Sequence, residues 1–190
     1  MCRLFLWRQE ENSKAVQKIM GEIHRKSPHK ELSAIARPSK EIAYLLASEE
    51  GRTTASVGRW GFEIPTGKLI YNARQETTMS KGMFSGCFQN ARCIVPAHSF
   101  FEWDKEQRCF SFSQKEAGLL YFAALYRRQG EDSEIVILTT HSRGEIEAVH
   151  HRMPLILDES KLRPWLFDTS ASMLLLSQGS VSLKKEIIET

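Results

Sequence analysis

The feature that most constrains the fold of this chain is a succession of short apolar runs, separated by glycine, proline and charged turn residues. Runs of this length and composition are typical of β-strands. Segments with helical periodicity are few and do not alternate with the strands, which excludes a doubly wound sheet. The sequence therefore predicts an α+β fold with a mostly antiparallel, barrel-like sheet core and flanking helices. The expected strands are residues 3–7, 42–47, 54–63, 92–95, 98–103, 109–113, 118–126 and 134–140.

One segment outside the sheet has clear helical periodicity. Apolar residues recur at helical spacing after the start signal Asn12-Ser13, so we expect an amphipathic helix at residues 13–25. Its lysines and arginines are expected to form a solvated face. The less regular segments are residues 71–76 (a helix or an irregular loop), residues 145–149 (a short helix), the stretch after Asp158 (a helix that Pro164 kinks or shortens) and residues 180–190 (a last strand or a frayed end).

Composition places the chain among ordinary globular proteins. It has 190 residues, of which 42% are hydrophobic and 26% charged, which suits one domain spanning residues 1–190. A net charge of +3 permits an anionic partner without requiring one. The 4 cysteines form no CxxC pair, so we expect reduced thiols and a cytoplasmic protein. The apolar start stops at Arg8, and no run is long enough to span a membrane, so we expect no membrane partner.

Cys2 offers reactive chemistry if the initiator methionine is removed, which a small residue at position 2 usually permits. The new N-terminus would carry an amine with a pKa of about 7.7–8.0 beside a thiol with a pKa of about 8.5. Such a pair can trap an aldehyde, first as an imine and then as a thiazolidine ring. Alternatively, the amine can act as general base for the thiol, as in N-terminal nucleophile hydrolases. The plain alternative is that Cys2 has no special role.

Two further polar clusters lie in apolar or turn-rich surroundings. Asn72-Ala73-Arg74 combines an amide with a guanidinium fork suited to phosphate or carboxylate. The asparagine can equally be a turn residue, and Arg74 can equally pair with Glu76 or Glu102. Glu102 lies within an aromatic segment, residues 100–103. Burial there would raise its pKa toward that of a general acid or base, whereas strand alternation would leave it on a solvated face.

The last cluster, His150-His151-Arg152, combines the usual proton carrier at neutral pH with an anion contact. A pair of adjacent histidines can also be solvent-exposed or can cap a helix. As zinc ligands the pair is poor, because adjacent histidines rarely bind one ion and the sequence has no HExxH motif. We therefore expect no metal and no cofactor.

In this order and spacing, the clusters resemble the SOS-response-associated peptidase (SRAP) family, whose members shield abasic sites in single-stranded DNA. The resemblance runs from Met1-Cys2 to about Leu157. The chain departs from the family pattern at Arg3, which directly follows Cys2 in place of a glycine. The matching segments are Met1-Cys2, Trp60-Gly61, Asn72-Ala73-Arg74 with Glu76-Thr77, residues 92–97, Phe101-Glu102-Trp103, Thr139, and His150 followed by Arg152-Met153-Pro154.

This resemblance implies a barrel-like α+β fold and a mechanism. Cys2 would form a thiazolidine with the ring-opened abasic sugar, while Asn72 orients its amine. Glu102 would move protons, and His150 would help to open the sugar and release the 3′ strand, an abasic-site lyase activity. Cys2 and Glu102 would also remove Met1, an autopeptidase activity. The implied partner is single-stranded DNA containing abasic sites, bound by a monomer, and the expected DNA contacts are Arg3, Trp60, Arg74, Lys81, Thr139 and Arg152.

Two other functions remain open from the sequence. The chain could be a cysteine or N-terminal nucleophile peptidase, or an amidohydrolase, that acts on other substrates. It could also be a binding module without catalysis, which would require Cys2, Glu102 and His150 to lie far apart.

Overall fold

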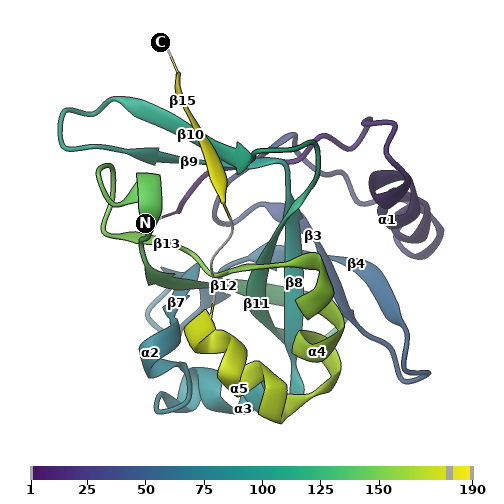
Figure 1. Ribbon diagram of the computed structural model, residues 1–190. Helices are drawn as coiled ribbons and strands as arrows, with labels where there is room; N and C mark the ends of the chain where they lie inside the picture. Colours follow the sequence, from purple (N-terminus) through teal and green to yellow (C-terminus); the bar gives the residue numbers. More distant parts are fainter. Residues whose placement is uncertain (1, 179–181, 189–190) are drawn as a thin grey trace.

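The computed structural model describes residues 2–178 and 182–188 (Figure 1). Its centre is a closed ring of strands in which each neighbour pair is hydrogen-bonded, in the order β4-β3-β8-β11-β12. All pairs are antiparallel except the one that closes the ring, where β12 runs parallel to β4. The predicted α+β fold with a barrel-like sheet is confirmed. The strands are β3 (Glu41–Ala47), β4 (Thr53–Trp60), β8 (Arg92–Ala97), β11 (Leu120–Gln129) and β12 (Asp132–His141).

A second sheet lies across one side of this barrel and carries the N-terminal strand. In it, β1 (Phe5–Leu6) lies between β2 and β9, and Phe5 pairs with both Ala36 and Phe100. Phe5 also packs on Trp60 and Phe122, with ring centroids 5.1 and 5.8 Å away. These aromatic contacts anchor the start of the chain in the core that both sheets share. The other strands are β2 (Ile35–Ala36), β9 (Ser99–Trp103), β10 (Cys109–Gln114) and β15 (Leu183–Ile188).

Short strands extend the barrel at the end where the candidate site lies. β7 (Asn72–Arg74) adds to β12 in parallel and β13 (Arg152–Pro154) adds antiparallel, so β12 holds both in register. β14 (Ile156–Leu157) pairs with β11 in the same way. A hairpin of β5 (Phe62–Glu63) and β6 (Leu69–Ile70) leads into β7. At its start Gly61 has a φ of 124°, and an added Cβ would lie 2.4 Å from Leu69, so this turn requires glycine.

The helix predicted at residues 13–25 is α1 (Lys14–Lys26). Ser13 caps it by accepting a hydrogen bond from the backbone N–H of Val16, and its buried stripe packs on β4. The polar segment at residues 71–76 forms β7 and then begins α2 (Gln75–Thr78). None of the helices in the described residues is long and apolar enough to cross a membrane.

The remaining helices differ from expectation in detail. The helix expected at residues 145–149 is a 3₁₀ turn, η1 (Gly144–Ile146). Asp158 precedes a second 3₁₀ turn, η2 (Glu159–Lys161), without a side-chain capping bond, and α4 (Leu162–Phe167) follows. Pro164 lies in the first turn of α4, where the missing N–H is tolerated, so it does not kink the helix. Two helices, α3 (Gly82–Asn90) and α5 (Thr169–Gln178), were not predicted. The last strand lies at Leu183–Ile188, and the rest of the expected segment 180–190 lies largely outside the described residues.

Candidate functional site

Cys2 lies fully buried beneath the end of the barrel that β7 and β13 extend. The main chain just after it is held in place, because Phe101 donates its N–H to the Leu4 carbonyl over 3.0 Å. The Cys2 thiol faces that same carbonyl, with Sγ 3.8 Å from the oxygen. Burial, together with the nearby Glu102 carboxylate, raises the pKa of the thiol well above its usual range. Burial therefore favours the protonated thiol of Cys2 over the thiolate.

Asn72 contacts Cys2 directly. Its side-chain Nδ2 donates a hydrogen bond of 2.7 Å to the Cys2 carbonyl oxygen. β7 holds Asn72 here through its parallel pairing with β12, where Asn72 lies opposite Ile137. The other amide atom, Oδ1, is buried and has no hydrogen-bond partner among the described residues. A buried acceptor of this kind costs free energy unless a donor reaches it, so an N–H group that reached Oδ1 would lower that cost.

Glu102 lies on the buried face of β9 together with Phe100, and its exposed fraction is only 3%. The two alternatives left open by the sequence are thus resolved in favour of burial. Burial raises the pKa of the carboxyl, and nearby positive groups, including His150 and Arg3, oppose that rise. A buried carboxyl whose pKa is raised in this way is suited to hold and return a proton.

His150 reaches the site from the segment between η1 and β13. Its Nδ1 lies 3.0 Å from both the backbone nitrogen and the carbonyl oxygen of Arg152, so the main chain of β13 sets the ring orientation. The ring stacks on His151 with centroids 4.5 Å apart. His150 also lines a cleft of about 530 Å³ between the β9–β10 turn and this segment. The cleft gives the histidine access to solvent and to a bound molecule.

The structure therefore brings Cys2, Asn72, Glu102 and His150 together from the N-terminus, β7, β9 and the segment before β13. The charge of Glu102 affects the Cys2 thiol, and His150 in turn affects Glu102. A binding module without catalysis would require Cys2, Glu102 and His150 to lie far apart, and the structure does not meet that condition. The catalytic roles of these residues remain a proposal.

Arg152 differs from the expectation that it contacts DNA. It is 3% exposed, and its guanidinium donates two hydrogen bonds to the Glu76 carboxylate, of 2.7 and 3.0 Å. It also donates to the backbone oxygen of Thr139, and Thr139 itself is fully buried. Arg152 and Thr139 thus join α2, β12 and β13 to one another. The sequence analysis named Glu76 as a possible partner of Arg74 and as part of a matching family segment, but it missed the pairing of Glu76 with Arg152.

The other expected DNA contacts divide into one buried residue and three exposed ones. Trp60 is fully buried, packs against Phe5 and donates its indole N–H to the Tyr71 carbonyl over 2.8 Å. It therefore presents no face to a nucleobase, and the expectation for it is corrected. Arg3, Arg74 and Lys81 are exposed, and the Arg3 guanidinium lies over the Trp103 ring at 5.0 Å. Within the described part of the chain, Arg74 forms no ion pair with Glu76 or Glu102.

No group of three or more histidine, cysteine, aspartate or glutamate residues that could hold a metal ion occurs within residues 2–178 and 182–188. All four cysteines are unpaired, and three of them are buried.

One known protein family matches nearly the whole of this chain. The family model described as SOS response associated peptidase (SRAP) matches residues 1–185. This chain belongs to the SRAP family. Among SRAP relatives, abasic site processing protein YoqW of Bacillus subtilis is 32% identical over 144 residues, which cover 68% of this chain and 64% of that protein. Abasic site processing protein YedK of Escherichia coli is 29% identical over 104 residues, which cover 51% of this chain and 47% of YedK. The matches thus span less than two thirds of the length of these relatives.

Solved structures show the same fold. A crystal structure of a Bordetella bronchiseptica protein has a TM-score of 0.80 at 20% identity, and the match covers the whole of both chains. One from Bacteroides thetaiotaomicron has a TM-score of 0.78 at 18% identity and covers 99% of this chain and 92% of that one. At these identities the likeness is one of fold alone.

Proposed function

We propose that this protein processes abasic sites in single-stranded DNA by forming a covalent thiazolidine between Cys2 and the abasic sugar, after Met1 has been removed. The observation that carries the proposal is the burial of Cys2 beside the Asn72 amide and the Glu102 carboxyl. The names of the SRAP relatives, which are abasic site processing proteins, support the choice of substrate.

The chemistry starts from the sugar aldehyde that an abasic site exposes when its ring opens. The Cys2 amine adds to the aldehyde carbon, and loss of one water molecule leaves an imine. The thiol sulfur then adds to the same carbon while its proton passes to the imine nitrogen. The product is a five-membered thiazolidine with a secondary amine, and no oxidant or reductant is needed.

Asn72 and Glu102 have different proposed roles around Cys2. The Nδ2 group of Asn72 holds the Cys2 carbonyl, and in this proposal the unpartnered Oδ1 accepts a hydrogen bond from the freed amine. Glu102 takes the proton that the buried thiol otherwise keeps and returns it to the imine nitrogen, as its raised pKa favours.

His150 is proposed to act on the sugar rather than on Cys2. The main chain of Arg152 holds its Nδ1 and so sets the ring orientation, and Nε2 is the nitrogen that we assign to proton exchange with the substrate. That exchange would open the sugar ring and assist release of the 3′ strand. Arg3, Arg74 and Lys81, which are exposed, are the proposed contacts to the flanking phosphates.

Removal of Met1 is part of the proposal, because the Cys2 amine is otherwise held in a peptide bond. The same Cys2 and Glu102 would hydrolyse the Met1–Cys2 bond, which is the peptidase activity. We expect the intact mass of wild-type protein to lack one methionine, and we expect Cys2→Ala to retain the residue or to depend on cellular aminopeptidase for its loss.

The decisive experiment mixes purified protein with a single-stranded oligonucleotide that contains one abasic site and resolves the products on a denaturing gel. Wild type should give a shifted covalent band, and Cys2→Ala should give none. Cys87→Ala is the matched control, because Cys87 is a half-buried thiol on α3 outside the site, and it should react like wild type. Absence of the band in wild type that has lost Met1, or an equal band from Cys2→Ala, would falsify the proposal.

A further inference from the structure

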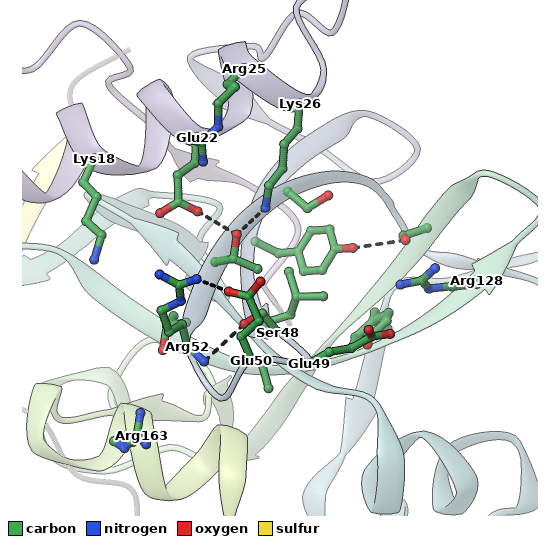
Figure 2. A pocket seen from close by; sticks show the side chains of 18 of the residues that line it. Lys18, Glu22, Arg25, Lys26, Ser48, Glu49, Glu50, Arg52, Arg128 and Arg163 are labelled. Carbon is green, nitrogen blue, oxygen red and sulfur yellow. Dashed lines mark hydrogen bonds and ion pairs between the residues drawn. The ribbon is translucent and has the colours of Figure 1, made fainter.

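A large depression lies on the side of the barrel away from the candidate site. Figure 1 shows α1 on the opposite side of the molecule from β13 and the N-terminus. Beside α1 lies an open groove of about 1260 Å³, walled by α1, the β3–β4 turn, the end of β11 and α4 (Figure 2). We call it the α1 groove. Its volume exceeds that of a typical small-molecule pocket, which favours an extended occupant.

Basic side chains from every wall converge on the α1 groove. Lys18, Arg25 and Lys26 lie on one face of α1, because they are spaced by seven and eight residues along the helix. Figure 2 shows their side chains on one edge of the opening, with Arg128 and Arg163 on other edges. The sequence predicted only a solvated helix face here, because nothing local indicates that α4 and β11 bring further arginines to meet it.

Two of the carboxylates in the groove, those of Glu22 and Glu50, already bind other groups of the protein. Glu22 accepts hydrogen bonds of 2.7 Å from the backbone N–H of Ala55 and from the Thr54 hydroxyl, which fastens α1 to β4. Glu50 is paired with Arg52. Within the described residues, by contrast, Arg25 and Arg128 form no ion pair with any carboxylate. The groove therefore keeps unneutralised cations, although Glu49 and Glu131 also lie in its wall.

The floor of the groove carries hydroxyl groups and aromatic rings beside the apolar side chains of Leu46 and Ala47. The Tyr44 hydroxyl donates to Ser133 over 3.1 Å, and the Tyr44 and Tyr126 rings lie 5.7 Å apart. Because Ser133 accepts from the buried Tyr44, its own hydroxyl proton can be donated to a phosphate oxygen held by the cations around the groove. The half-buried Tyr126 adds an aromatic ring on which a nucleobase can stack.

We propose that the α1 groove is a second phosphate-binding site that holds the backbone of a single nucleic-acid strand at a distance from Cys2. The recognised chemistry is a phosphodiester chain. The choice of nucleic acid over free polyphosphate rests on the proposed function. The inference that the groove binds phosphate groups does not. A strand long enough to reach around the barrel would occupy both the candidate site at Cys2 and the α1 groove. A short strand would occupy only the candidate site at Cys2.

The test compares two double variants that lose the same charge. Arg25→Gln/Arg128→Gln removes two groove cations, and Lys14→Gln/Lys115→Gln removes two exposed lysines outside it. Fluorescence anisotropy measures binding to an intact single strand, about 30 nucleotides long and without an abasic site, over a range of salt concentrations. We expect the groove variant to bind about tenfold more weakly and its salt slope to fall by about 1.4, that is, about 0.7 for each lost phosphate contact. In the control variant, neither the affinity nor the salt slope should change by more than a small fraction of these amounts.

Three outcomes overturn the inference. The first is unchanged DNA binding in the groove variant, and the second is an equal loss of DNA binding in the control variant. The third is a groove variant that loses binding to inorganic polyphosphate but retains DNA binding. The last result would assign the groove to a free polyanion. Because the intact strand has no aldehyde, repeating the measurement in Cys2→Ala separates the groove from the proposed covalent chemistry. Both double variants should still form the adduct with a short abasic oligonucleotide at the wild-type rate.

Discussion

At the scale of single residues, burial controls the chemistry of the candidate site. Burial raises the pKa values of both the Cys2 thiol and the Glu102 carboxyl, so a negative charge on either group costs more free energy there than in solvent. Each negative charge would also disfavour the other, so only one of the two can ionise readily. A single mobile proton shared between a nucleophile and a base is the arrangement that the thiazolidine step needs.

Glu102→Gln is expected to stabilise the folded protein at neutral pH. Since the raised pKa means that the folded state holds this proton more tightly than the unfolded chain, stability falls as the pH rises above the ordinary glutamate pKa of about 4.3. The variant lacks this loss. Thermal melts at several pH values should show its advantage at pH 7 and convergence with wild type below about pH 4. Glu116→Gln, on the exposed turn after β10, should follow wild type throughout, and parallel curves for Glu102→Gln would contradict this account.

Asn72→Ala is expected to slow adduct formation rather than abolish it. The change removes the hydrogen bond to the Cys2 carbonyl and the buried acceptor beside it. We expect the single-turnover rate to fall by about 10-fold to 100-fold, corresponding to about 1–3 kcal/mol for a lost buried hydrogen bond. Asn90→Ala, an exposed asparagine on α3, is the matched control. A wild-type rate in Asn72→Ala would remove Asn72 from the proposed site.

At the scale of elements, the site depends on how β12 collects its neighbours. β7 and β13 both pair with β12, and the bond between Arg152 and Glu76 ties α2 to them. The pair is unequal in burial, because the Arg152 side chain is 4% exposed and that of Glu76 is 36% exposed. This inequality predicts which partner is more costly to lose.

Glu76→Ala is expected to destabilise the protein more than Arg152→Met. The first change leaves a guanidinium buried without a counter-charge, which costs about 3–5 kcal/mol. The second leaves a carboxylate that water can reach and replaces the guanidinium with an apolar side chain, so about 1–2 kcal/mol is expected from the lost hydrogen bonds. Urea denaturation of both variants measures the difference. Equal losses, or a reversed order, would show that the ion pair does not hold α2 to β13.

At the scale of the whole molecule, the N-terminal segment is integrated into the fold rather than attached to its surface. His98 lies at the junction of β8 and β9, accepts the Arg8 N–H at Nδ1 over 3.0 Å, and has Nε2 at 2.9 Å from Glu11. Its ring also packs on Trp7. The segment that follows Cys2 is thereby clamped to the barrel, so local chemistry at Cys2 depends on global stability.

His98→Gln is expected to weaken the acid sensitivity of the protein. Burial and the nearby Arg8 lower the pKa of His98, while Glu11 opposes the shift. As the pH falls below about 6.5, the unfolded chain takes up a proton that the folded state resists, so folded stability declines. Denaturation at pH 7.5, 6.5 and 5.5 should show a flatter decline in the variant than in wild type. His24→Gln, an exposed residue on α1, should keep the wild-type decline, and a parallel decline in His98→Gln would refute the clamp's role.

Much of the local structure follows from short-range pattern. The apolar runs predicted most of the barrel strands, and the spacing from Val16 to Ile23 predicted α1, because one buried face imposes its period on consecutive residues. Helix α5 was missed since Leu174, Leu175 and Leu176 are consecutive and show no helical period. The resemblance of ordered motifs was sufficient to predict the family.

Local pattern along the chain was enough to predict the class of fold, the first helix and the residues worth considering for chemistry. Packing between distant segments was needed to show that β4 and β12 close the barrel in parallel, that Trp60 is core, and that Arg152 holds Glu76, 76 residues away. The physical reason is that periodicity records which face of an element is buried, whereas the partner it is buried against depends on packing between distant segments. Charged residues carry the least local information of all, because an arginine is equally compatible with solvent, a carboxylate or a phosphate until its surroundings are formed.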